Sequence, residues 1–204
     1  MDVLLAFAAA LVTLRLAAEL FRKWHARRAP ELLAWAASLT AFAAASGALA
    51  WGAAAGWDDR AFRAFYLFGG LLTAALLGAG SLLRVGVRAA GPVALVYAGL
   101  AIGVAVSVPI DTPVTGSEIP DAAEHLAFFP ARALALVGNV AGTVAAIGVA
   151  LTGLRRRPIG NALIIAGVAV AAAGSAIAGL GEGGGAVFAA LAAGLLYGGF
   201  VSPR

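Results

Sequence analysis

The chain contains no cysteine in its 204 residues. A disulfide framework, a thiolate metal site and a cysteine nucleophile are therefore excluded. Histidine is nearly as rare, since only His25 and His125 occur and both lie between apolar runs. Intramembrane haem usually needs paired histidines, a hydrolytic metal centre gathers histidines with carboxylates, and a serine nucleophile needs a histidine base. We therefore expect no enzymatic activity and no cofactor.

Charge is scarce as well. Charged residues make up 12% of the chain and hydrophobic residues 62%, with a mean hydropathy of +0.96, whereas a soluble domain is about a quarter charged and about half apolar. This composition predicts a multi-pass protein of the inner or plasma membrane. The net charge of +4 comes from basic residues between apolar runs, where they set orientation. Nucleic acid is thus not an expected partner; the expected partners are the bilayer and a bound lipid or small solute, and a homo-oligomer is compatible.

Seven apolar segments approach the length of about twenty residues that a helix needs to cross a bilayer. Their approximate ranges are 3–21, 32–55, 61–83, 92–109, 131–153, 159–179 and 185–201. Arg15 and Glu19 interrupt the first, and no small-residue cleavage site follows it, so we expect it to be retained rather than removed as a signal peptide. The sequence therefore predicts an all-α membrane protein, a single seven-helix transmembrane domain over residues 1–204.

The basic residues divide unevenly between the two sets of connections. Three fall on one side, namely Arg60, Arg63 and Arg132. Ten fall on the other, namely Arg22, Lys23, Arg27, Arg28, Arg84, Arg88, Arg155, Arg156, Arg157 and Arg204. Because cytoplasmic connections carry the excess of lysine and arginine, we expect the N-terminus outside and the C-terminus in the cytoplasm. The two arginine runs can also contact anionic lipid.

The longest polar connection is the outer loop at 110–130. Pro120 suits a first helical position, which predicts a short helix on the membrane surface with Phe128 and Phe129 in the interface. Carboxylates and a histidine in this loop are candidate cation ligands, although such a cluster is also typical of a solvated surface. These residues are Glu118, Asp121, Glu124 and His125.

Two ionisable residues lie inside the first apolar segment. Arg15 and Glu19 are four residues apart, hence on one helix face and able to form a pair. Charged groups inside a span are costly and commonly functional, so the pair would line an ion or proton path if it faces the bundle interior. Alternatively, Arg15 snorkels to the cytoplasmic interface, with Glu19 already at that boundary.

Uncharged polar residues form a second candidate site. Asn139 and Thr143 share one face of the fifth segment near mid-membrane, and an asparagine amide in hydrocarbon must find hydrogen-bonding partners. Tyr66, Thr73 and Tyr97 are weaker candidates of the same kind. These side chains would coat a small polar cavity, or they would bond across helices as packing contacts.

Glycines recur at four-residue spacing in four segments. Such spacing lets helix backbones approach closely, and we expect it to serve packing inside the bundle rather than oligomerisation. The pairs are Gly52 and Gly56, Gly99 and Gly103, Gly138 and Gly142, and Gly194 and Gly198.

The run Phe62-Arg63-Ala64-Phe65-Tyr66-Leu67-Phe68-Gly69, continued by apolar residues to Leu82, resembles a segment of uncharacterised seven-helix membrane proteins of high-GC actinobacteria. The basic patch after the first segment and the Gly160-Asn161-Ala162-Leu163 opening of the sixth resemble the same family. The resemblance covers most of the chain and implies the seven-helix architecture, but no activity, cofactor or residue role.

Two function hypotheses remain from the sequence. The first is a small permeation or transport protein that passes a solute or ion by way of Asn139, Thr143 and Tyr66, with Arg15 and Glu19 nearer the cytoplasm. The second is a non-catalytic accessory protein that holds a lipid or a partner's helix in grooves between alanine- and glycine-rich surfaces. A retinal protein of the rhodopsin type is excluded, because the 185–201 segment has no lysine for a Schiff base.

Overall fold

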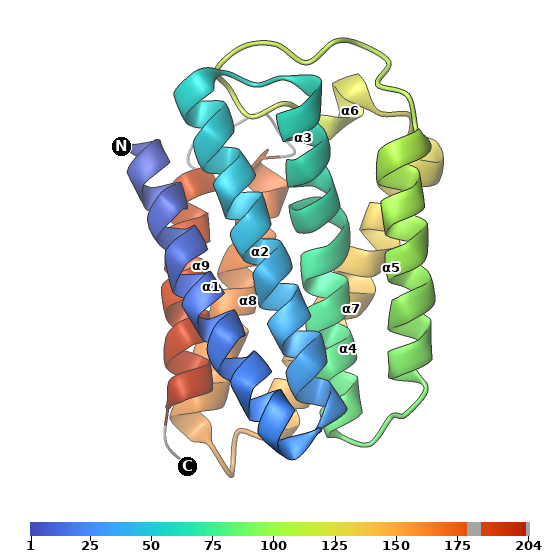
Figure 1. Cartoon of the computed structure of the whole chain (residues 1–204). Helices are drawn as coiled ribbons and strands as arrows, with labels where there is room; N and C mark the ends of the chain where they lie inside the picture. The colour runs from blue at the N-terminus through green and yellow to red at the C-terminus, as the bar shows by residue number, and fades with distance from the viewer. Residues whose placement is uncertain (179–184, 203–204) are drawn as a thin grey trace.

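The computed structural model describes residues 1–178 and 185–202, and throughout these residues the regular structure is helical, without β-strands. The helical rods run side by side along one axis, and the described connections between them lie at the two ends (Figure 1). The rods are α1 (Asp2–Arg27), α2 (Pro30–Ala55), α3 (Asp59–Phe65) continued by η1 (Tyr66–Thr73) and α4 (Ala74–Arg84), α5 (Ala90–Ser107), η2 (Phe128–Arg132) continued by α7 (Ala133–Thr152), α8 (Pro158–Ala178) and α9 (Gly185–Val201).

Six of these rods are long and apolar enough to cross a membrane, and α9 is a shorter apolar helix. The expectation of an all-α protein built from membrane-length apolar helices is therefore confirmed for the described residues.

The first helix continues past its predicted end at residue 21, as far as Arg27. Arg28 then takes a left-handed conformation, with φ 53°, and its N–H donates to the carbonyl of Trp24. A helix can extend beyond the bilayer into water, and basic residues in its last turn interact favourably with the helix dipole. The end of the apolar run therefore marks the membrane boundary better than the end of the helix.

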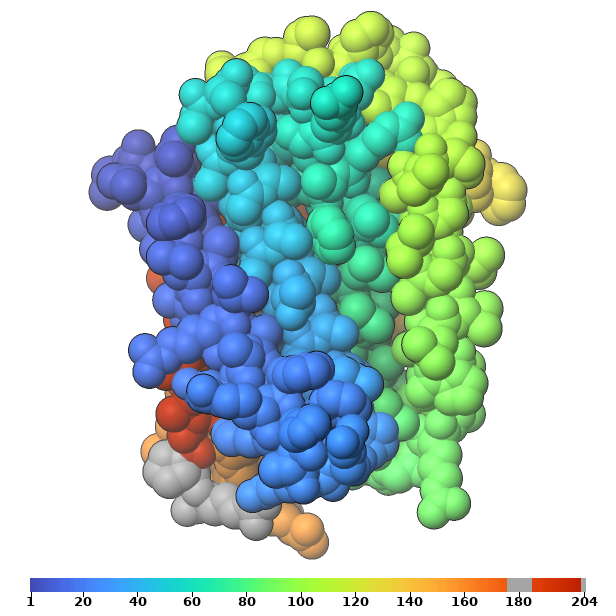
Figure 2. Space-filling view, in the orientation of Figure 1, coloured from blue at the N-terminus to red at the C-terminus, as the bar shows by residue number. Residues whose placement is uncertain are grey.

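Six rods form a closed ring, and the seventh lies outside it. Around the ring, α1 contacts α2, α2 contacts the α3–η1–α4 rod, α4 contacts α7, α7 contacts α8, α8 contacts α9, and α9 returns to α1. The outer rod, α5, packs mainly against η1 and α4. Its outward side chains, including Val93, Leu95 and Val106, are largely exposed, and Figure 2 shows α5 along the side of the molecule opposite α1.

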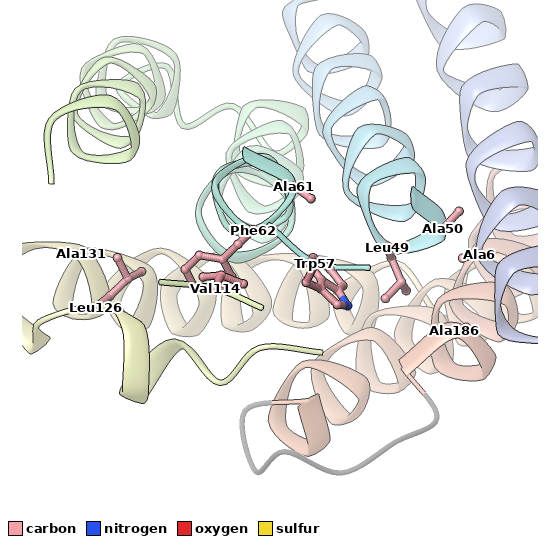
Figure 3. Close-up of a cluster of buried hydrophobic side chains, with 10 residues drawn as sticks. All are labelled: Ala6, Leu49, Ala50, Trp57, Ala61, Phe62, Val114, Leu126, Ala131 and Ala186. Carbon is pink, nitrogen blue, oxygen red and sulfur yellow. The ribbon is translucent and has the colours of Figure 1, made fainter. Parts of the chain in front are cut away.

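Small side chains fill the ring. The buried residues are mainly alanine, with leucine and a few aromatic side chains, and the buried polar residues among those described are Thr13, Ser38, Ser46 and Ser81. Trp57 lies at the end of the bundle where α3 begins after its N-cap residue Asp58, which is called here the acidic end. Its side chain packs with Leu49 of α2 in a cluster of buried apolar residues (Figure 3). The centre of the ring is therefore occupied by packed side chains.

The connection over residues 108–127, here called the cap loop, is folded onto this acidic end. The N–H of Val114 donates to Asp59 Oδ1 at 2.9 Å, the N–H of Trp57 donates to the carbonyl of Gly116 at 2.7 Å, and Val114 is buried. A short helix is present, α6 (Ala122–His125), but Pro120 is not its first residue. Asp121 is the N-cap and accepts the N–H of Ala123 at 2.8 Å, so the expected start was wrong by two residues.

Candidate functional site

The candidate polar residues meet at η1, where the third rod is π-helical instead of α-helical. In a π-helix the carbonyl of residue i accepts the N–H of residue i+5 instead of i+4. Where the pattern changes, some backbone carbonyls lack a partner within the helix and can accept from other donors. Such segments are frequent at functional sites. Thr73 donates its hydroxyl to the carbonyl of Phe68 at 2.7 Å, and Ser38 of α2 donates to the carbonyl of Thr73 at 2.7 Å. The η1 backbone is thus bonded by side chains from within and from α2.

Asn139 and Tyr97 supply two further donors to the same segment. Asn139 Nδ2 lies 2.6 Å from the carbonyl oxygen of Gly70 and 2.9 Å from that of Ala135 in its own helix. The Tyr97 hydroxyl lies 3.1 Å from the carbonyl oxygens of both Leu71 and Leu134, which share its one proton. Side chains from α2, α5 and α7 therefore converge on η1, and the amide that sequence reasoning singled out bonds to backbone.

The other two residues of the predicted cavity have no such role. Thr143 is half-buried one turn after Asn139 on α7. Tyr66 has a buried hydroxyl without a hydrogen-bonding partner among the described residues. The structure therefore brings Tyr66, Tyr97, Asn139 and Thr143 to neighbouring elements, and of these four only Tyr66 lines the pocket described next.

The pocket beside Tyr66 is small. It lies between α3, α5 and the cap loop and encloses about 10 Å³, room for about one water molecule. Its lining is mostly apolar: Phe62, Arg63, Tyr66, Val104, Ala105, Val108, Leu126 and Ala131. A solute larger than water does not fit there in this conformation.

Arg15 and Glu19 form the one ion pair among the described residues, with Arg15 Nε 3.5 Å from Glu19 Oε1. The Arg15 side chain is 74% exposed and that of Glu19 is 22% exposed. The buried face of α1 is formed instead by Thr13, Leu16 and Leu20. Arg15 thus lies on the outer surface of the ring rather than in its interior.

The acidic cluster of the cap loop does not form a group of three cation ligands within the described residues. The Asp121 carboxylate caps α6, and His125 Nδ1 lies 2.9 Å from both the hydroxyl and the carbonyl oxygen of Thr112. Glu118 and Glu124 are exposed. Two of the four candidate ligands are therefore engaged in local contacts that hold the loop together.

Sequence reasoning missed two arginines that cap helix ends. Arg63 Nη1 donates to the carbonyl of Ala105 at 2.7 Å, and Arg157 Nη2 donates to the carbonyl of Gly199 at 3.2 Å. Both acceptors belong to the last turn of a helix, where carbonyls lack partners within the helix. The general excess of carbonyls at helix C-termini was the available signal, but it does not say which arginine reaches which helix.

The glycine pairs separate into inner and outer ones. Gly138 and Gly142 are buried, and a Cβ added at Gly78 of α4 would lie 2.6 Å from the Cα of Gly142. By contrast, Gly99 and Gly103 are exposed on α5 with open space around them. The expectation that the pairs pack inside the bundle was therefore wrong for Gly99 and Gly103 of α5, and also for Gly194 of α9, which is exposed with open space around it.

Most of the basic residues lie at the end of the bundle opposite the cap loop, and most of these are exposed. Arg28 lies over the Trp24 ring at 5.1 Å from its centroid, and Arg84 lies over the Trp35 ring at 5.8 Å. Aromatic rings beside arginines are typical of a membrane–water boundary.

Comparison with family models, curated proteins and solved structures finds no match for this chain. Its function must therefore be argued from its own geometry.

Proposed function

We propose that this chain is a non-catalytic accessory protein of the cell membrane, which binds a lipid or a partner's helix along the outward surfaces of its bundle. One observation carries the proposal. Three of the five polar side chains that would line a pathway, Asn139, Tyr97 and Thr73, donate to backbone carbonyls of η1, as Asn139 does to Gly70. Groups already bonded in this way contribute to packing rather than to solute binding.

The proposal includes seven crossings, with the N-terminus outside. Its support is that α9 runs alongside α8 and α1 in the ring (Figure 1) and that the basic residues gather at one end. Because the natural chain has no cysteine, single cysteines report sidedness directly. In intact cells an impermeant thiol reagent should label Glu118→Cys and leave Arg155→Cys unlabelled; the reverse pattern would overturn the orientation.

The outward surfaces offer two kinds of binding region. On α5, the exposed Gly99 and Gly103 leave room between larger side chains such as Leu95 and Leu100, which suits an acyl chain or a neighbouring helix. At the basic end, exposed arginines match anionic headgroups. No catalytic role is proposed, because His125 is engaged by Thr112 and His25 lies at the other end of the bundle.

Transport remains the competing function, and one experiment separates the two. The protein is purified with its associated lipids and partners, analysed by lipid and protein mass spectrometry, and reconstituted into liposomes for flux assays over a panel of ions and small solutes. We expect a lipid or protein retained in stoichiometric amount and flux equal to that of empty liposomes. Flux that Asn139→Ala alters, without a retained ligand, would establish transport instead.

A further inference from the structure

Two arginines near the cap loop are not explained by membrane orientation. Cytoplasmic connections carry the excess of basic residues, and Arg60, Arg63 and Arg132 are the three basic residues expected on the other side. Arg60 is exposed, whereas Arg63 and Arg132 are half-buried. A half-buried guanidinium at a membrane boundary needs a counter-charge or hydrogen-bonding partners, because it has lost part of its hydration. These two residues therefore need a local explanation.

Both arginines lie beside the small pocket that is lined by Arg63, Tyr66 and six apolar residues, here called the outer pocket. Arg63 lines it from α3, and Tyr66 follows about one turn later on the same rod. Arg132 directly follows Ala131, which lines the pocket from η2 near Phe62 (Figure 3). The charge of Arg132 is close enough to act on the Tyr66 hydroxyl. Two positive charges and one phenolic hydroxyl thus converge here from two rods.

Neither arginine has a carboxylate partner within the part of the chain that the structure describes. Arg63 donates one N–H to the carbonyl of Ala105. Arg132 lies over the exposed Phe128 ring, with 5.8 Å between its guanidinium carbon and the ring centroid. The Tyr66 hydroxyl is buried without a hydrogen-bonding partner among the described residues. All three side chains therefore have polar groups left for a ligand from outside the chain.

The carboxylates at the start of α3 do not supply the missing negative charge. Asp58 accepts the N–H of Ala61 at 2.7 Å, and Asp59 accepts the N–H of Val114 at 2.9 Å. Both groups hold the local fold at the acidic end and form no ion pair with an arginine in the described residues. An anionic ligand would balance the two guanidinium charges.

We propose that the phosphate of an anionic phospholipid binds Arg63 and Arg132 at the mouth of the outer pocket. The proposal rests on the accessory function, for which it names the ligand class and the site. The planar N–H fork of arginine matches phosphate oxygens. The pocket, at about 10 Å³, is too small for the phosphate itself but has room for one water molecule. That water links the Tyr66 hydroxyl to a phosphate oxygen.

The surroundings favour a lipid over a soluble phosphate. Phe128 and Phe129 are 59% and 79% exposed beside Arg132, and exposed aromatic side chains are typical of a membrane interface. Val104 and Val108 of the pocket lining offer apolar contacts to the glycerol and acyl groups, which inorganic phosphate lacks. Two positive charges without a carboxylate also favour an anionic headgroup over a zwitterionic one.

Photo-crosslinking locates the lipid. The purified protein is reconstituted with a small fraction of phosphatidylglycerol that carries a diazirine beside its headgroup, and the labelled peptides are mapped by mass spectrometry. We expect labelling around Val104 and Val108 of α5 and in η2. Labelling confined to the basic end of the bundle would overturn this site while leaving the accessory function standing.

Charge removal tests the assignment to the arginines. Arg132→Gln removes one charge without breaking a described hydrogen bond and should lower the labelling at the outer pocket about tenfold or more. Arg63→Gln should act in the same direction, and Arg132→Gln decides the matter if that variant fails to fold. The matched control is Arg60→Gln, which removes an exposed charge from the same end of the bundle and should leave the labelling unchanged. Equal losses in Arg60→Gln and Arg132→Gln would indicate a general attraction and overturn the site.

Two further arms separate the phospholipid from other anions. Excess inorganic phosphate should leave the labelling at the outer pocket intact, and its loss would assign the arginines to a soluble oxyanion and overturn the lipid. In native membranes, a protein cross-linked there in place of lipid would likewise overturn it. Solute flux without any retained ligand would instead refute the accessory function on which the proposal rests.

Discussion

Two glycine pairs with identical spacing lie in opposite surroundings. On α7, Gly138 and Gly142 are buried, and Gly142 faces the backbone of α4. On α5, Gly99 and Gly103 are exposed, and an added Cβ would meet no neighbouring atom within 4 Å. The inner pair permits close helix contact, whereas the outer pair leaves a surface open to lipid or a partner. The comparison shows that glycine spacing gives the face of a helix but not what that face meets.

The largest effect is expected at the inner contact. Gly78→Ala places a Cβ 2.6 Å from both the Cα and the carbonyl oxygen of Gly142, so α4 and α7 must separate. We expect a loss of about 1–3 kcal/mol in the free energy of unfolding, measured by SDS titration in mixed micelles. An unchanged free energy would mean that these helices are not in backbone contact.

The next largest effect concerns the amide beside the inner pair. Asn139→Ala removes the donor to the Gly70 carbonyl in η1 and should lower the free energy of unfolding by about 1 kcal/mol. Ser107→Ala is the control, because Ser107 is exposed and bonds only within α5, to Gly103. Equal effects of both substitutions would argue against an η1-centred polar contact.

A smaller and local effect is expected where α5 joins the ring. Tyr97→Phe removes the hydroxyl shared by the carbonyls of Leu71 and Leu134, at a cost of about 0.5–1 kcal/mol. Because α5 makes few other inward contacts, hydrogen exchange should rise in α5 peptides and stay constant in α1 and α2. A uniform rise over all helices would show that α5 is an integral part of the ring.

The smallest effect is expected at the outer pair. Gly99→Ala adds a methyl group in open space and removes the flexibility of a helical glycine, so the free energy of unfolding should be unchanged or about 0.5–1 kcal/mol higher. Destabilisation in the native membrane, without destabilisation of the isolated monomer, would reveal a partner packed against α5.

The helical rods were predictable because a helix that crosses the bilayer needs a long run of apolar residues. The observed ends of α2 and α9 lie within two residues of the predicted ends. The π-helical turn was not predictable, since Tyr66–Thr73 has the composition of any apolar helix. Its form depends on partners far away in sequence, such as Asn139, which lies 69 residues beyond Gly70.

The candidate site could be predicted only in part, because its hydrogen-bonding partners also come from distant parts of the sequence. A buried amide must find an acceptor, so Asn139 was expected to point inward, but the identity of the acceptor depends on which helices are neighbours. The position of α5 outside the ring was also hidden, because both of its faces are apolar and lipid accepts apolar side chains as readily as a protein core does. Arg15 lies on the outer surface of the ring, whereas the alternatives that the sequence left open were an internal path and the cytoplasmic interface.

Accessibility of the Asn139 position to water tests most directly whether the interior polar groups serve packing or a pathway. In the otherwise cysteine-free chain, Asn139→Cys is treated in liposomes with a small water-soluble thiol reagent, beside Glu118→Cys in the exposed cap loop. The account predicts rapid labelling of Glu118→Cys and no labelling of Asn139→Cys until the protein is unfolded. Labelling of both variants at similar rates in the folded protein would contradict it and indicate a hydrated pathway through the bundle.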